Sequence, residues 1–347
     1  MMLPLLPLIL IIPIIGSLIL LIIDRKEFLN GDPSLIKNNE IRLKQVALST
    51  SLINFFVSLF IWFNFDSNIS QYQFVLEFNH LGLFDFNFGI DAISLYFVLL
   101  TTFITPIALL SNYSNLLGKE AENIKFFLIS ILLLESLQIC AFVSLDLILF
   151  YIFFESVLPV LFILIVVFGH GEDRLRSAFL FFLYTLSGSL PMLLSILLIY
   201  SYLGTTDFNL ISEIDFDIQK ILFLGFFIAF AVKTPMTPFI IWLPKAHADS
   251  VLSGSIILAG TILKLATYGY LRIILNMLPE AATYFAPMVQ TIAIISLVYS
   301  SFATIVQQDT KRLIAYSSIA LYGPIYLYKF ININILKQTL CRNFSKV

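Results

Sequence analysis

The sequence predicts an all-α protein, a polytopic bundle of about ten transmembrane helices. Hydrophobic residues make up 59% of the 347 residues, and charged residues only 12%, about half of their share in a soluble globular chain. The apolar residues fall in runs of roughly 20, the length that a helix needs to cross a bilayer. The alternating ten-residue pattern of a membrane barrel is absent from the sequence, so helices are the remaining spanning structure.

The predicted spans alternate with loops of contrasting charge. Loop 169–177 holds Arg174 and Arg176, for example, whereas loop 203–218 holds four acidic residues and no basic one. By the positive-inside rule, the basic loops face the cytoplasm or the mitochondrial matrix, and the amino terminus faces the other side. The ten spans cover approximately residues 3–23, 45–65, 91–112, 124–144, 147–168, 178–202, 219–240, 253–275, 284–306 and 311–329.

Composition also excludes several classes of function. The net charge is −2, from 20 basic and 22 acidic residues, which does not favour nucleic acid as a partner. The two cysteines, Cys140 and Cys341, form no CxxC pair, and the three histidines are scattered. These residues predict no metal, haem or iron–sulfur site, so we expect this chain to bind no cofactor and to carry no redox centre itself.

Four ionisable residues lie deep in apolar segments: Glu135, Glu155, Lys233 and Lys264. Each costs about 2.5–3.5 kcal/mol at a helix centre, and such a group normally faces the bundle interior, pairs, or lines a water path. We interpret them as candidate proton carriers. The alternative for Glu155 and Lys233 is an ion pair that only orients helices, and for Glu135 a simple polar contact between helices.

The two lysines are the stronger candidates. A buried ammonium is disfavoured by desolvation and favoured by a nearby carboxylate, so a lysine whose partner moves can load and release a proton. Lys233 lies in "AFAVKTPMTPF", where Pro235 and Pro238 each remove a backbone donor. A lysine at a broken helix is typical of a transport site. An ordinary proline kink is the alternative. A second lysine, Lys264, lies on the next predicted span. Two lysines on successive helices predict a relay that passes protons from one to the other.

Two further features have simpler interpretations. The small residues of "SGSIILAGTILK" indicate close helix packing that positions Lys264. His247 lies in "WLPKAHADS", at a helix end. We interpret it as an exposed or interfacial structural histidine, with proton shuttling as the alternative because imidazole titrates near neutral pH.

Several stretches carry a resemblance to a known family. They are "FGIDAISLYFVLLTTFITPIALLS", "LILFYIFFESVLPVLFILI", "FFLYTLSGSLPMLL", "AVKTPMTPFIIWLPKAHADS", "GSIILAGTILKLATYGYLR" and "QQDTKRLIAYSSIA", across residues 80–320. Together they resemble the subunit 4 family of NADH–ubiquinone oxidoreductase, respiratory complex I, and its mitochondrial members in particular. The resemblance implies an antiporter-like membrane subunit of a proton-translocating enzyme, through which quinone reduction elsewhere in the complex drives protons.

The resemblance also implies roles, partners and a location. Glu155 looks like the family glutamate that pairs with the lysine of the broken helix, here Lys233, and Lys264 looks like the lysine that continues the path. The family offers no role as secure for Glu135. NADH, FMN, iron–sulfur clusters and ubiquinone are expected on partner subunits, and the other membrane-arm subunits and lipids are the expected partners. The expected location is the mitochondrial inner membrane, with a bacterial plasma membrane as the alternative.

The sequence departs from the family towards its end. Lys245 stands where the family usually has an acidic residue, and Leu321 follows "AYSSIA" where the family has a histidine. We therefore divide the chain into an antiporter-like domain, 1–320, and an atypical tail, 321–347. The expectation is a truncated product, or a subunit whose remainder is encoded separately. The alternative functions are a self-standing cation/proton antiporter subunit and an inert fragment.

Overall fold

The structure is a computed structural model that describes residues 5–23, 33–69, 71–77, 86–112, 121–208 and 214–321. The chain divides into two compact units. The first unit comprises Met1–Leu175 and Ser250–Tyr268, and the second comprises Arg176–Asp249 and Gly269–Val347.

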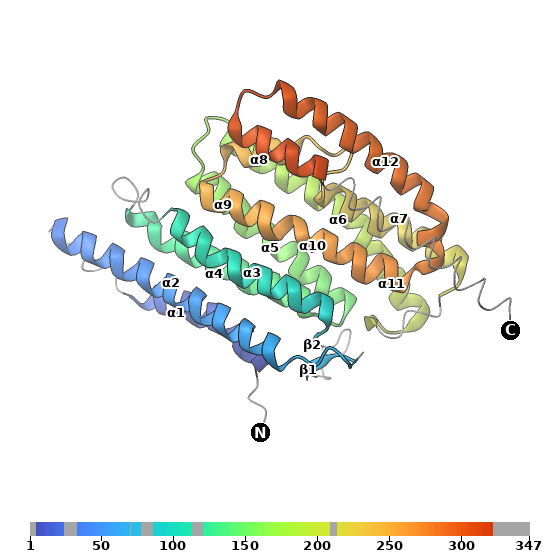
Figure 1. The fold of residues 1–347 in the computed structure, drawn as a ribbon, viewed down its shortest axis with the longest axis horizontal. Helices are drawn as coiled ribbons and strands as arrows, with labels where there is room; N and C mark the ends of the chain where they lie inside the picture. Colours follow the sequence, from blue (N-terminus) through green and yellow to red (C-terminus); the bar gives the residue numbers. More distant parts are fainter. Residues whose placement is uncertain are drawn as a thin grey trace. The chain divides into compact units, whose positions relative to one another are not determined.

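Helix α4 is the central helix of the first unit. It packs against α1, α2, α3 and α5, and Figure 1 shows α1 to α4 lying side by side. Of its membrane-length segment, 78% is buried within the protein, so its polar side chains face other helices. The five helices are α1 (Leu5–Ile22), α2 (Pro33–Asn64), α3 (Ala92–Ser111), α4 (Ala121–Val143) and α5 (Leu147–Phe168).

Two acidic residues at the edges of predicted spans begin helices. The carboxylate of Asp91 accepts a hydrogen bond from the Ser94 amide, and the Ser94 hydroxyl accepts one from the Asp91 amide, which completes a capping box at α3. Asp146 accepts from the amides of Ile148 and Leu149 at the start of α5. Each carboxylate satisfies amide groups that have no partner inside the helix.

A small antiparallel sheet lies between α2 and α3, and the sequence did not predict it. Strand β1 (Gln73–Leu76) pairs with β2 (Phe88–Ile90), with Gln73 opposite Ile90 and Leu76 opposite Phe88. Figure 1 shows the two strands beyond the end of α2. The prediction of a helical membrane fold is otherwise confirmed.

A second part of the first unit packs on α3. It consists of α9 (Leu252–Ile257), a π-helical turn η3 (Leu258–Ile262) and most of α10 (Leu263–Gly269). At Gly260 a Cβ atom would come within 2.6 Å of the Ile104 side chain of α3. The small-residue segment is therefore a close packing surface, as the sequence predicts.

The second unit contains the broken helix. Helix α7 packs against α12 and against the π-helical turn η4. Its elements are α6 (Arg174–Leu203), α7 (Phe216–Lys233), α8 (Trp242–Asp249), η4 (Tyr270–Ile274), α11 (Leu275–Met277) and α12 (Pro279–Val306), followed by helical residues 310–321.

Helices α6 and α7 approach each other at glycines. A Cβ atom at Gly188 would lie 2.8 Å from Val232, next to Lys233, and one at Gly225 would lie 2.7 Å from the backbone oxygen of Pro191. Backbone cannot yield as a flexible side chain can. Glycine at these two positions therefore fixes the spacing of the helices that surround Lys233.

We expect Gly225→Ala to destabilise the second unit by about 1–3 kcal/mol, the usual effect of overpacking. The measurement is the thermal unfolding midpoint of the purified protein in detergent. Gly254→Ala is the matched control, because its nearest atom would lie at an ordinary contact distance of 3.4 Å. Equal midpoints for the two variants would contradict the packing account.

The helices match the predicted spans closely. Within the described residues, eight helices are long and apolar enough to cross a membrane. They correspond to eight of the ten predicted spans. The seventh predicted span, 219–240, is interrupted: α7 ends at Lys233. The tenth, 311–329, is helical as far as Leu321, and the rest of it lies outside the described residues, as does the tail after Leu321.

Candidate functional site

Lys233 is the last residue of α7 and is buried, with 1% of its surface exposed. The carboxyl end of a helix carries a partial negative charge, which favours an ammonium group in the last turn. The fold thus places a titratable cation inside the protein, at a helix end that interacts with its charge. The sequence predicted both the burial and the position at a helix break.

The helix ends at Lys233 because of Pro235. In a continuing helix the Ala231 carbonyl would accept from residue 235, and proline has no N–H to give. The amide of Met236 donates to that carbonyl instead, at 2.8 Å. One carbonyl further on, the Val232 oxygen accepts from the Trp242 indole N–H at 2.9 Å. The freed carbonyls are satisfied by protein groups, as a membrane interior requires.

The broken segment after Lys233 is held by other side chains of the second unit. The Thr237 amide donates to the Ser296 hydroxyl of α12 at 2.7 Å, and that hydroxyl also bonds the Thr237 side chain at 3.0 Å. The Trp242 ring packs on Phe181 with centroids 5.3 Å apart. The segment is thus fixed to two neighbouring helices rather than being a simple bend in α7.

Lys264 lies between two π-helical turns. It is the second residue after η3 and precedes η4, and its side chain is half-buried. At the end of η3 the Leu263 amide donates to the Leu258 carbonyl, five residues back. Single π turns inside helices occur often at functional sites. This feature adds to the case for Lys264, and no sequence signal predicted it.

Glu155 lies in the middle of α5, with both carboxylate oxygens buried. Glu155 and Lys264 belong to the first unit, and Lys233 belongs to the second. The pairing of Glu155 with Lys233 that the resemblance implies stays a prediction.

Glu135 is completely buried in α4, and its Oε1 atom accepts a hydrogen bond from the Asn54 amide of α2 at 2.7 Å. The alternative interpretation of Glu135, a polar contact between helices, therefore describes part of its environment. No local pattern identifies Asn54 as the partner, because the two residues are 81 positions apart.

His247 lies in α8 and is buried, so the predicted exposed or interfacial position is wrong: the helix packs this residue inside the protein. Burial, with the nearby Lys311 cation second, lowers the pKa of the imidazole to about 4. At neutral pH the ring is neutral, so a role in proton transfer would be that of a relay, which accepts at one nitrogen and releases from the other. The neighbouring Asp249 accepts a hydrogen bond from Ser177, and Lys311 donates to the Ala248 carbonyl at 3.5 Å.

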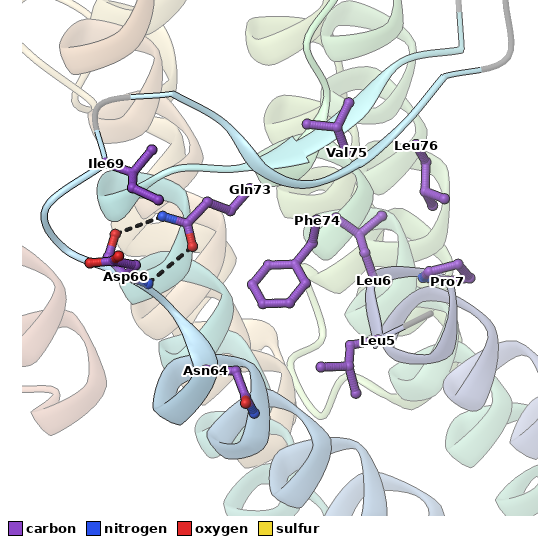
Figure 2. A pocket seen from close by; sticks show the side chains of 10 residues that line it. All are labelled: Leu5, Leu6, Pro7, Asn64, Asp66, Ile69, Gln73, Phe74, Val75 and Leu76. Atoms are coloured by element: carbon purple, nitrogen blue, oxygen red, sulfur yellow. Dashed lines mark hydrogen bonds between the residues drawn. The ribbon is translucent and has the colours of Figure 1, made fainter. Parts of the chain in front are cut away.

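A cavity of about 560 Å³ lies elsewhere in the first unit, at the start of α1 and the end of α2. Figure 2 shows Leu5, Leu6 and Phe74 on its apolar side. On the other side, the Gln73 side chain donates to the Asp66 carbonyl and accepts from the Asp66 amide. Asp66 is its only ionisable lining residue among the described ones, so this cavity adds no further group to the candidate proton path.

Comparison with known proteins decides the family. The family model for the transmembrane part of NADH:quinone oxidoreductases and Mrp antiporters matches residues 144–338, more than half of the chain. The chain belongs to this NADH:quinone oxidoreductase/Mrp antiporter family. The matched range includes Glu155, Lys233, His247 and Lys264 and runs past residue 320.

Two named relatives support the same family assignment. The chain is 51% identical over 329 residues to the NADH-ubiquinone oxidoreductase chain 4 of Mycosarcoma maydis, covering 94% of this chain and 65% of that protein. It is 40% identical to the NADH-quinone oxidoreductase subunit M of Rickettsia typhi, and the match covers 93% of this chain and 64% of that protein. The chain thus spans less than two thirds of the length of these relatives.

A solved structure supports the same fold within the family. The chain superposes on a chain of respiratory complex I from Thermus thermophilus, solved with bound NADH, with a TM-score of 0.78 and 26% identity. The match covers 94% of this chain and 64% of that one. The antiporter-like fold that the sequence predicted is therefore confirmed.

Proposed function

We propose that this chain is a core membrane subunit of NADH:ubiquinone oxidoreductase, which translocates protons across the membrane as electrons pass from NADH to ubiquinone. The observation that carries the proposal is Lys233, a buried cation at a helix end whose carbonyls are bonded by Met236 and Trp242. We further propose that Glu155, Lys233 and Lys264 carry the proton, with Glu135 and His247 as additional candidates.

The chemistry of the redox reaction belongs to other subunits in this proposal. NADH, FMN, the iron–sulfur clusters and ubiquinone are held by partner subunits, and the other membrane-arm subunits and lipids surround this chain. The enzyme is thus a proton-translocating NADH:ubiquinone reductase to which this chain contributes a proton path. Similarity to relatives named for NADH:ubiquinone and NADH:quinone oxidoreduction supports this assignment.

The proposed location is the mitochondrial inner membrane, because the identity is 51% to the chain 4 relative and 40% to the bacterial subunit M. The bacterial plasma membrane is the alternative. We propose residues 1–320 as the translocating domain and 321–347 as an atypical tail. Since the family match reaches residue 338, this boundary needs a direct test.

A self-standing cation/proton antiporter subunit is the second candidate. The family description names Mrp antiporters beside the NADH:quinone oxidoreductases. The same glutamate and lysines would carry protons in either kind of protein. Assembly distinguishes the two candidates. An antiporter subunit would be found apart from NADH-oxidising activity.

Peptide mass spectrometry on fractionated inner membranes tests the proposal. We expect peptides of this chain to migrate with the NADH-oxidising complex, including the tail peptide "FININILK". Finding the chain only in fractions without that activity would favour the antiporter. Finding family-like sequence in place of "FININILK" would show that the tail is not part of the mature subunit.

A further inference from the structure

Three side chains in the first unit form a buried polar cluster that the proposed proton path does not use as a group. Asn54 on α2 and Glu135 and Gln138 on α4 are each completely buried. The Asn54 amide nitrogen donates to Glu135 Oε1 at 2.7 Å. Gln138 lies one helical turn beyond Glu135, where side chains three residues apart are neighbours. We call these three residues the α4 polar cluster.

Four atoms of the α4 polar cluster have no hydrogen-bond partner in the part of the chain that the structure describes. They are Asn54 Oδ1, Glu135 Oε2, Gln138 Oε1 and Gln138 Nε2. A buried polar atom left unsatisfied costs about 1–3 kcal/mol, and native proteins rarely keep several together. Such groups are normally satisfied by an ordered internal water, which needs two to four polar partners.

The donors and acceptors of the cluster indicate the protonation state of Glu135. An ionised carboxylate only accepts hydrogen bonds, whereas a protonated one also donates through its O–H. Three of the four unsatisfied atoms are acceptors when Glu135 is ionised, and Gln138 Nε2 is the single donor among them. A proton on Oε2 turns one acceptor into a donor. Two donors and two acceptors can then be joined by water.

The charges on neighbouring helices give no compensation for an ionised Glu135. The helices packed against α4 are α1, α2, α3 and α5. Glu135 forms no ion pair within the described residues, and Asn54, which donates to it, is uncharged. An isolated carboxylate away from water costs far more than a neutral acid. The ionisable residues of these helices and their N-caps whose side chains are described are Glu40, Arg42, Lys44, Asp91, Tyr96, Asp146, Tyr151 and Glu155.

We propose that the α4 polar cluster is a buried, water-containing proton-binding site, at which Glu135 holds a proton as a neutral carboxylic acid. The proton arrives from water on Oε2 and leaves by the same route, with no other bond made or broken. The site does not depend on transport through Lys233. It stands whether or not the chain works within an NADH-oxidising complex.

Infrared difference spectroscopy on the full chain in lipid vesicles tests the proposal. The spectrum of the wild type minus that of Glu135→Gln, at neutral pH, is expected to show the C=O stretching band of a protonated carboxylic acid. Because the site contains water, the band is expected to shift when H₂O is replaced by D₂O. Gln138→Leu removes one acceptor and one donor from the cluster, so the band should persist at a changed frequency.

Glu280→Gln is the matched control, because Glu280 is exposed at the start of α12. Its difference spectrum is expected to lack the acid C=O band that Glu135→Gln removes. A carboxylate band in place of the acid band for Glu135→Gln would overturn the proton-binding site. An acid band that does not respond to D₂O would overturn its hydration. Neither readout depends on NADH oxidation, so failure here is distinguishable from failure of the proposed function.

Discussion

Replacing Lys233 by alanine is expected to reduce NADH-driven proton transport by at least about tenfold, equivalent to about 1.4 kcal/mol or more on the barrier. The substitution removes the only titratable group at the end of α7, where the side chain is buried and the helix stops. The measurement is proton uptake per NADH oxidised by membrane vesicles that contain the assembled complex. Unchanged proton yield and turnover would refute the transport role.

Lys233→Arg separates a proton carrier from a structural cation. Arginine keeps the positive charge but does not deprotonate in proteins, so it can replace an ion-pair partner and cannot relay a proton. We expect this variant to lose transport as well. Full transport in Lys233→Arg would favour the interpretation of Lys233 as an orienting charge.

Lys220→Ala is the matched control on the same helix. Lys220 is partly exposed and forms a salt bridge with Asp217 at 2.9 Å. An exposed pair of this kind contributes about 0–1 kcal/mol to stability, so transport should be unaffected. A transport loss equal to that of Lys233→Ala would show that the assay reports damage to α7 rather than loss of a proton carrier.

The protein is expected to lose about 3 kcal/mol of stability through His247 as the pH falls from about 6.5 to about 4. Burial and the Lys311 cation hold the pKa of the folded imidazole below its usual value. The unfolded chain therefore binds the proton first, and protonation favours unfolding. The contribution is fully present above the unfolded pKa and is lost as the pH approaches the folded one.

The measurement is the thermal unfolding midpoint in detergent across this pH range. His247→Gln should flatten the pH dependence, because glutamine does not titrate. His170→Gln, at an exposed position, should leave the wild-type slope in place. The same slope in all three proteins would mean that His247 is not the group responsible.

The sequence was sufficient for the features that depend on composition and on proline chemistry. Runs of apolar residues located the membrane helices, and the predicted bounds of the eight spans lie within about five residues of the helix ends, except that α2 begins at Pro33, well before the predicted start at residue 45. The break after Lys233 was predictable because Pro235 has no N–H for the Ala231 carbonyl. The burial of Lys233 followed from its place in an apolar segment.

Other features depend on contacts between distant segments, and local sequence does not encode these. The Asn54–Glu135 hydrogen bond requires α2 to lie beside α4, and the short β1–β2 pairing requires two ends of a loop to meet. Asp91 and Asp146 could have been recognised as helix caps from their places before apolar runs. No residue pattern indicated the π turns on either side of Lys264.

The π turn η3 has a consequence for the direction in which Lys264 points. Each residue advances an α-helix by about 100° around its axis, and a π turn accommodates roughly one residue more than an α turn. Deleting one residue within Leu258–Ile262 would therefore let the helix regularise with the direction of Lys264 largely kept, whereas regularising η3 at its present length would turn Lys264 by about that angle relative to α9. The direction in which the Lys264 side chain points around the helix axis is therefore set by the π geometry of Leu258–Ile262.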